Sequence, residues 1–310
     1  MTVPTWVVGS GGLLGGALTG VLRRRGTQPY TSRVPWNDPL GARAVLLTDA
    51  RRLIQSAAGG PWRVAWCAGA GVNGTSMEEF DGENALLRAV LDELDAGSGA
   101  GNAGTVFHAS SAGGVYAGSP GPPHNEMSSV APLGDYGRAK LAAEKIVTDF
   151  AGRSGARVVV GRFANLYGPG QNLAKPQGLI SHLCRGYLVS APISIYVPMD
   201  TLRDYVYISD AAEMVADTLD RAYLRESRVA TKIYASGHSV TIGAILGACR
   251  TVFRKKPNVV LATSALASTQ ARDLRLRSVV WDDIDRRTHR TLPAGIASTL
   301  DAIRRDIASS

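Results

Sequence analysis

The chain has 310 residues and a formal net charge of +8, and 45% of its residues are hydrophobic. This length and composition predict a folded protein of one large or two moderate domains and exclude an intrinsically disordered chain. No apolar run approaches the roughly 20 residues that a membrane-spanning helix needs, so we expect no membrane partner. Its 3 cysteines are widely separated and offer neither a disulfide framework nor metal-ligand spacing, so we expect a cytoplasmic protein without a metal site.

Positive charge is concentrated in two zones of the chain. Residues 1–75 contain eight arginines against two aspartates, and residues 250–290 contain ten basic against four acidic residues. Two such zones suit an anionic ligand approached from two sides, although solvated surface arginines would give the same pattern. No nucleic-acid-binding signature accompanies them, so we expect no nucleic-acid partner.

The first half of the chain alternates short apolar runs with amphipathic stretches. This alternation is typical of an α/β fold, with a doubly wound parallel sheet covered by helices. Strands are predicted at 5–8, 28–32, 63–67, 105–109 and 157–161, and helices at 13–25, 41–57, 82–94 and 136–151. Residues 205–209 and 232–235 are predicted to be returning strands. We therefore predict a larger domain over 1–168, to which 200–238 return, and a smaller lobe formed by 169–199 and 239–310.

Three glycines follow the first predicted strand directly. Gly9, Gly12 and Gly15, with Leu14 among them, occupy the turn into the first predicted helix. Glycine allows a tight turn there and lets a pyrophosphate approach the backbone N–H groups of a helix N-terminus. A glycine-rich turn without a ligand is the alternative, but the strand–turn–helix context favours a Rossmann-like dinucleotide-binding domain.

Two further motifs carry side chains that could do chemistry. Tyr136 and Lys140 are four residues apart, which places them on one face of a helix. A phenol has a pKa of about 10, and a nearby ammonium favours its anionic form, which can exchange protons. Ser110 and Ser111 end a predicted buried strand, where ligands of α/β proteins bind, although serines also cap turns there.

Together these motifs resemble the extended short-chain dehydrogenase/reductase superfamily, in particular its NAD(P)-dependent nucleotide-sugar epimerase/dehydratase/reductase branch. The resemblance covers most of the chain, including the run from Arg162 to Gln171 and the run from Arg203 to Asp210. It implies a dinucleotide-binding domain with a smaller C-terminal substrate lobe. It also implies a homodimer formed through the helices predicted at 82–94 and 136–151.

The resemblance also implies roles for individual residues. Tyr136 would be the general acid/base, Lys140 would bind the nicotinamide ribose and favour the phenolate, and a serine would hydrogen-bond the reacting oxygen. Ala68 and Asn84 would contact the cofactor. The substrate-binding residues would be Ser110, Asn165, Arg203 and Arg272, with Arg203 on the pyrophosphate.

The sequence departs from the family around the serines. The family usually places its catalytic hydroxyl four residues before the tyrosine of a Val-Tyr pair, and here that position is Ala112. Either Gly113 and Gly114 bulge the strand end, so that Ser111 takes the role with Ser110 as the second choice, or the hydroxyl contribution is weakened. The dehydratases of the family have an acidic pair just after this hydroxyl, and its absence here disfavours dehydration.

A second departure concerns the cofactor. An acidic residue at the end of the second strand holds the ribose 2′-hydroxyl of NAD, but here Ser32 and Arg33 stand there. An arginine can pair with a 2′-phosphate, so we expect NADP to be preferred, with NAD possible. The connection from Arg33 to the next helix is short and shows no further strand.

These observations predict an oxidoreductase that acts on a nucleotide-activated sugar by reversible hydride transfer. Two reactions remain open, epimerisation with a retained cofactor and 4-keto reduction with an exchanging one. A non-catalytic dinucleotide sensor of the same fold is the competing hypothesis. The presence of both Tyr136 and Lys140 favours the enzyme.

Overall fold

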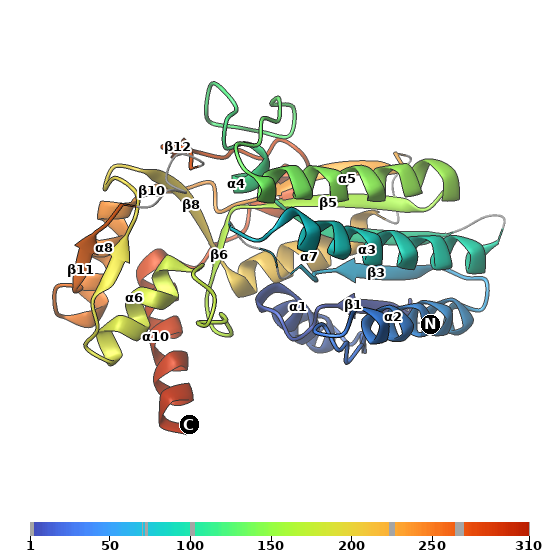
Figure 1. Ribbon diagram of the computed structural model, residues 1–310, viewed down its shortest axis with the longest axis horizontal. Helices are drawn as coiled ribbons and strands as arrows, with labels where there is room; N and C mark the ends of the chain where they lie inside the picture. The colour runs from blue at the N-terminus through green and yellow to red at the C-terminus, as the bar shows by residue number, and fades with distance from the viewer. Residues whose placement is uncertain are drawn as a thin grey trace.

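A six-stranded parallel sheet forms the larger part of the molecule (Figure 1). The computed structural model describes residues 3–69, 71, 74–99, 103–222, 227–263 and 270–309. The strand order is β2-β1-β3-β4-β5-β9, and every neighbouring pair is parallel. The strands are β1 (Thr5–Val8), β2 (Tyr30–Thr31), β3 (Trp62–Trp66), β4 (Gly104–Ser111), β5 (Arg157–Phe163) and β9 (Val229–Tyr234).

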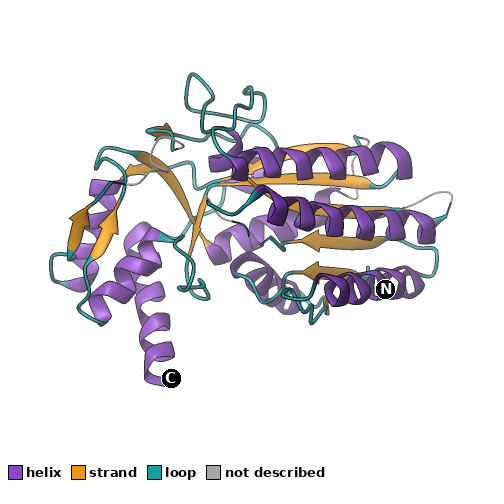
Figure 2. Cartoon of the chain, viewed as in Figure 1, coloured by secondary structure: helices purple, strands orange, loops and turns teal. Residues whose placement is uncertain are grey.

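Helices cover both faces of this sheet, as Figure 2 shows. On one face are α2 (Pro39–Ala57), α3 (Met77–Ser98) and α5 (Asp135–Ser154), and their core includes Leu46, Leu87 and Phe150. On the other face are α1 (Leu13–Arg24) and α7 (Ile208–Ala222), whose core includes Leu18 and Met214. Burial on both faces explains why the strands are continuous apolar runs rather than alternating ones.

The smaller lobe is built around a second sheet and a third apolar core. In this sheet β8 (Leu202–Tyr207) pairs with β6 (Asn165–Tyr167), β10 (Ser239–Thr241) and β12 (Asp273–Leu274). The helices α6 (Leu179–Leu188), α8 (Ile242–Phe253) and α10 (Leu292–Ser309) pack together around Ile180, Ile245 and Ile296. The short strands β7 (Ile193–Ile195) and β11 (Val259–Leu261) pair with each other, and α4 (Ala112–Val115) and α9 (Asp282–Asp285) are single turns.

The predicted α/β fold class, with a Rossmann-like sheet and a smaller C-terminal lobe, is confirmed. The expectation that 205–209 return to the main sheet is wrong, because β8 ends at Tyr207 and belongs to the second sheet. The third helix begins at Met77 rather than at residue 82, because the Ser76 hydroxyl caps it by accepting from the Glu79 N–H. The division into 1–168 with 200–238, and 169–199 with 239–310, stays a prediction.

The edge of the main sheet lies at β2. The strand has only two residues where five were predicted, and α2 begins soon afterwards at Pro39. Doubly wound sheets commonly carry a further strand outside the second one, and here β2 itself is the outermost strand. Among the described residues, no helix is both long and apolar enough to cross a membrane.

Candidate active site

The turn between β1 and α1 can be built only with glycine at two positions. Gly9 has a φ of +85°, and a Cβ there would lie 2.7 Å from the backbone nitrogen of Ala68. A Cβ at Gly15 would overlap the carbonyl oxygen of Gly9. The glycines therefore bring the start of α1 against the ends of β1 and β3, the arrangement that a diphosphate-binding turn requires.

Within the described ranges, no side chain caps the N-terminus of α1. Gly12 occupies the N-cap position, and its own N–H donates to the Gly9 carbonyl at 3.0 Å. Helix N-terminal N–H groups without partners attract anions, so this end of α1 fits the diphosphate of a dinucleotide. The Leu14 side chain is buried in the core, which leaves only its backbone to face such a ligand.

The residues after β2 offer a guanidinium and no free carboxylate. The Ser32 hydroxyl accepts a hydrogen bond from the Trp6 indole N–H at 2.8 Å, and the Arg33 side chain is exposed. The first carboxylate in this segment, Asp38, caps α2 by accepting from the Gly41 N–H at 3.0 Å. The described residues at this end of β2 therefore present a positive charge where NAD-binding domains commonly present a negative one.

Tyr136 and Lys140 lie on one face of the first turns of α5. The Lys140 ammonium is 5.7 Å from the centroid of the Tyr136 ring. The ring also packs on α4, because a Cβ at Gly114 would be only 3.1 Å from two of its carbons, and Phe80 of α3 lies 6.1 Å away between centroids. The phenol is thus held between α3 and α4.

The Lys140 ammonium also reaches the end of β3. A Cβ at Gly69 would lie 3.2 Å from Lys140 Nζ and 3.8 Å from a carboxylate oxygen of Glu83. The other oxygen of Glu83 accepts from the Gly71 N–H at 3.1 Å. Glu83 is therefore a charged member of this region that the sequence motifs did not identify. The amide of its neighbour Asn84 donates to the Ala139 carbonyl at 3.5 Å and so bridges α3 and α5.

A neutral imidazole lies in β4 near Lys140. His108 is 2% exposed, and neither of its ring nitrogens has a partner among the described residues. Burial lowers the pKa of His108 to about 3, and the charge of Lys140 acts in the same direction. The imidazole is therefore uncharged at neutral pH.

The two serines at the end of β4 have different surroundings. Ser110 is buried and donates at 2.6 Å to Glu144, whose carboxylate is also held by Arg162. Ser111 caps α4 by accepting from the Gly114 N–H at 3.1 Å, and its own O–H has no acceptor among the described residues. A bulge at Gly113 and Gly114 was one of the two alternatives that the sequence left open, and in the structure both glycines lie in the helical turn α4.

Glu144 and Arg162 form a buried ion pair that the motifs also missed. The Arg162 guanidinium donates to Glu144 at 3.0 and 2.6 Å and to the Tyr116 hydroxyl at 2.6 Å. Glu144 follows Tyr136 and Lys140 at four-residue intervals on one helical face, a spacing visible in the sequence. Ala112, at the family's usual hydroxyl position, is fully buried.

Arg203 in β8 is a buried cation without a carboxylate partner among the described residues. It is 9% exposed, and within the described part of the chain its guanidinium donates only to the Leu202 carbonyl, at 2.8 Å. Burial lowers the pKa of Arg203. Asn165 is exposed, and its amide donates to the Asp204 carbonyl at 3.0 Å, beside the same strand.

Arg272 does not join Arg203 in a buried site. Its backbone carbonyl accepts from the Leu202 N–H, which places it next to β8. Its side chain, however, is 72% exposed and forms an ion pair with Asp200. Among the described residues, no group of three or more His, Cys, Asp or Glu side chains is placed to hold a metal ion.

The chain is similar to known proteins in sequence and in fold. The model of the NAD dependent epimerase/dehydratase family matches residues 5–229. An uncharacterized UDP-glucose epimerase of Bacillus subtilis, YtcB, is 31% identical over 100 residues, 32% of this chain and 31% of that protein. The dTDP-4-dehydro-6-deoxyglucose reductase of Escherichia coli is 28% identical over 151 residues, 49% of this chain and 46% of that enzyme. The matched segments thus span less than half of these curated relatives.

Two solved structures share the fold along almost the whole chain. MoeE5 in complex with UDP-glucuronic acid and NAD has a TM-score of 0.80 at 24% identity, covering 98% of this chain and 99% of that one. The UDP-glucose 4-epimerase of Thermus thermophilus, in complex with NAD, has a TM-score of 0.80 at 21% identity, covering 97% and 99%. At these identities the likeness is one of fold.

Proposed function

The chain belongs to the NAD dependent epimerase/dehydratase family, and on that premise we propose that it transfers hydride reversibly at a ring carbon of a nucleotide-activated sugar. The observation that supports the proposal is the packing of the Tyr136 ring, with Lys140 beside it, against the short helix that Ser111 caps. Tyr136 packs on α4, which Ser111 caps, and Lys140 reaches the end of β3 beside the glycine turn.

Each residue of this group has a defined task. The glycine turn and the N-terminus of α1 hold the cofactor diphosphate, and Lys140 holds the nicotinamide ribose. When bound, the nicotinamide accepts or supplies the hydride. Tyr136 takes the proton from the sugar hydroxyl on oxidation and returns it on reduction. The O–H of Ser111 donates to the reacting oxygen.

Arg203 supplies the contact for the substrate diphosphate. A guanidinium forms bidentate, charge-assisted hydrogen bonds with phosphate oxygens, and a buried one without a carboxylate partner gains most from an anionic ligand. Asn165 lies beside the same strand and serves the nucleotide-sugar, whereas Arg272 stays in its exposed ion pair.

The proposed reaction is 4-keto reduction or epimerisation, and not dehydration. Ala112, Gly113 and Gly114 follow the serines and provide no carboxylate that could remove a proton from the sugar. Reduction needs a cofactor that exchanges, and the guanidinium after β2 favours NADPH, which is the usual exchanging reductant.

The experiment that tests the enzyme measures NADPH consumption with a panel of 4-keto sugar nucleotides, and interconversion of UDP-hexoses. Tyr136→Phe removes the proton-transfer group and is expected to lower kcat by about 10²- to 10⁴-fold while cofactor binding is kept. Tyr187→Phe is the matched control, because that ring stacks on Phe253 in the other lobe. Cofactor binding with no turnover of any substrate, by wild type or variant, would instead support a non-catalytic sensor.

We further propose that NADP binds more tightly than NAD, although MoeE5 and the Thermus enzyme contain NAD. The support is the exposed Arg33 and the use of Asp38 as a helix cap. Titrations with both cofactors are expected to show a preference for NADP that Arg33→Ala abolishes. Arg43→Ala, which removes an exposed arginine of α2, is expected to leave the preference unchanged. Tighter binding of NAD by the wild type would reject this assignment.

We also propose a homodimer formed through the outer faces of α3 and α5. Ala85 and Ala142 lie on these helices, away from the buried core. Light scattering is expected to give a dimer mass for the wild type and a monomer mass for Ala142→Arg. A monomeric wild type at micromolar concentration would contradict the dimer.

A further inference from the structure

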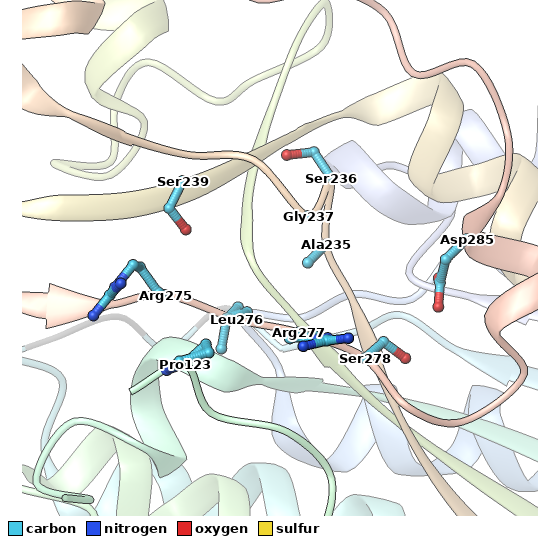
Figure 3. Close-up of a pocket in the computed structure, with 10 residues that line it drawn as sticks. All are labelled: Pro123, Ala235, Ser236, Gly237, Ser239, Arg275, Leu276, Arg277, Ser278 and Asp285. Atoms are coloured by element: carbon cyan, nitrogen blue, oxygen red, sulfur yellow. The ribbon is translucent and has the colours of Figure 1, made fainter. Parts of the chain in front are cut away.

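A cavity of about 450 Å³ lies outside the candidate active site, at the ends of β9 and β10 (Figure 3). The extended segment of residues 270–280, which we call the strap, forms another wall of this cavity. None of the residues assigned above to the cofactor, the sugar or catalysis lines it. The lining residues are Pro123, Ala235, Ser236, Gly237, Ser239, Arg275, Leu276, Arg277, Ser278 and Asp285.

The cavity lies on the face of the second sheet that is opposite to Arg203. Ser239 of β10 pairs directly with Asp204 of β8, so the two side chains point to the same face. Ser236 joins them, because its N–H and hydroxyl donate to Asp204 at 2.8 and 3.1 Å. Arg203 precedes Asp204 in the same strand and therefore points to the other face. A ligand in the cavity would not share the diphosphate site proposed for Arg203.

One arginine of this region differs from its neighbours. Arg272 pairs with Asp200, Arg275 with Asp273 and Arg287 with Asp217. Arg277 lines the cavity, and its guanidinium has no ion-pair or hydrogen-bond partner among the described residues. Part of the second basic zone of the sequence is therefore neutralised within the protein, and Arg277 remains as a charge that can serve a ligand.

The carboxylates near the cavity are already satisfied. Asp285 accepts two hydrogen bonds from the fully buried Lys232 ammonium, at 2.9 and 2.8 Å. Glu126, behind the strap, accepts from the Ile233 N–H at 2.8 Å, the Ser278 hydroxyl at 2.7 Å and the Val279 N–H at 2.8 Å. Their negative charge is offset locally, so they oppose an incoming anion less than free carboxylates would.

The same buried network fixes the shape of the cavity. Lys232 donates to the Ser278 hydroxyl at 3.0 Å and to the Val280 carbonyl at 2.7 Å, which ties the strap to β9. These bonds fix the backbone of the strap, which carries Arg277. Binding a ligand therefore costs less conformational entropy than it would if Arg277 were on a mobile loop. The Ser239 hydroxyl has no partner among the described residues and supplies a second donor.

We propose that this cavity is a second anion site, independent of the proposed function, and that it binds the phosphate group of a small phosphorylated molecule. Arg277 is the principal contact, and the Ser239 hydroxyl assists it. Guanidinium groups match phosphate geometry through paired N–H donors. The volume exceeds that of a bare phosphate ion and falls within the roughly 300–1,000 Å³ of small-molecule sites, so the phosphate is carried on an organic group.

Calorimetric titration of the full chain with glucose 1-phosphate, and separately with inorganic phosphate, tests the site. We expect one equivalent of glucose 1-phosphate to bind more tightly than inorganic phosphate. Arg277→Ala should weaken this binding by about tenfold or more. Arg286→Ala is the matched control, because that arginine is exposed and paired with Asp282, and it should leave the affinity unchanged.

The Arg203→Met variant separates this site from the candidate active site. Glucose 1-phosphate binding that persists in Arg203→Met and is lost in Arg277→Ala supports the proposal, whether or not any nucleotide-sugar is turned over. Binding that is lost in Arg203→Met, or that is unchanged in Arg277→Ala, overturns it. Absence of binding to the wild type at millimolar concentration overturns it as well.

Discussion

Two guanidinium groups in different parts of the molecule are buried to nearly the same extent but have opposite surroundings. Arg162 of β5, in the main sheet, is 8% exposed, and Arg203 of β8, in the second sheet, is 9% exposed. Arg162 is held by both oxygens of Glu144 and by a tyrosine hydroxyl. Among the described residues, Arg203 has only a neighbouring carbonyl.

The pKa values of the two arginines follow this difference. Burial opposes the charged form of both, but the bonds to Glu144 outweigh it at Arg162, so the pKa of Arg162 is raised. At Arg203 burial outweighs the weaker electrostatic influence of Tyr205 and Asp273, and the pKa of Arg203 is lowered. A buried charge whose partner the chain supplies becomes costly when that partner is removed, whereas Arg203 has no carboxylate partner among the described residues to lose.

The largest expected effect concerns Arg162, the arginine that has a buried ion pair. Glu144→Met leaves the Arg162 guanidinium buried without its counter-ion and is expected to lower the free energy of unfolding by about 3–5 kcal/mol. Chemical denaturation measures it. Lys145→Met on the same helix breaks only the exposed pair with Asp149 and should cost about 0.5 kcal/mol or less. Equal losses for both variants would contradict the assigned role of Glu144.

The next effect concerns Arg203, the buried arginine that has no carboxylate partner among the described residues. Arg203→Met keeps an apolar stem in place and removes a charge that has no carboxylate partner among the described residues, so the free energy of unfolding should stay level or rise. The affinity for UDP should fall by about 1.5–3 kcal/mol, because hydrogen bonds to charged groups are lost. Calorimetric titration with UDP measures this loss. A destabilisation as large as that of Glu144→Met, with UDP binding intact, would make Arg203 a structural residue.

The smallest effect concerns a buried group that is neutral, the imidazole of His108. His108 has a pKa of about 3 in the folded chain, against an ordinary value of 6.5. Between these values the unfolded chain binds a proton that the folded chain does not, so the free energy of unfolding falls as the pH falls. The slope contributed by His108 is about 1.4 kcal/mol per pH unit, and it vanishes above pH 6.5, the ordinary pKa of histidine.

Denaturation between about pH 4.5 and 6, inside this window, measures the slope for wild type and for His108→Phe, which cannot titrate. The variant is expected to lose the contribution of His108. A weaker dependence of the same sign remains from His124, whose pKa burial also lowers. His238→Gln, at an exposed position, should retain the wild-type slope. An unchanged slope in His108→Phe would mean that this imidazole is protonated in the folded chain.

Local patterns in the sequence were enough for the parts of the site that lie within one turn or one helix. The glycine turn from Gly9 to Gly15 and the spacing of Tyr136 and Lys140 depend on backbone conformation and on the helical repeat. The alternation of apolar and amphipathic runs likewise predicted the α/β fold with its parallel sheet. What these patterns could not give was the pairing of charges, since Ser110, Glu144 and Arg162 meet from three separate elements.

The sequence by itself determined the fold class, the glycine turn and the helical face that carries the tyrosine and the lysine, because these depend on residues a few positions apart. Only the tertiary structure decided which side chains already have a hydrogen-bond or ion-pair partner within the protein. It showed that Ser110 donates to Glu144, whereas the Ser111 O–H has no acceptor within the described part of the chain. It also showed that Arg272 pairs with an aspartate whereas Arg203, among the described residues, does not. The physical reason is that burial and charge balance arise from neighbours in space, which residue spacing along the chain does not specify.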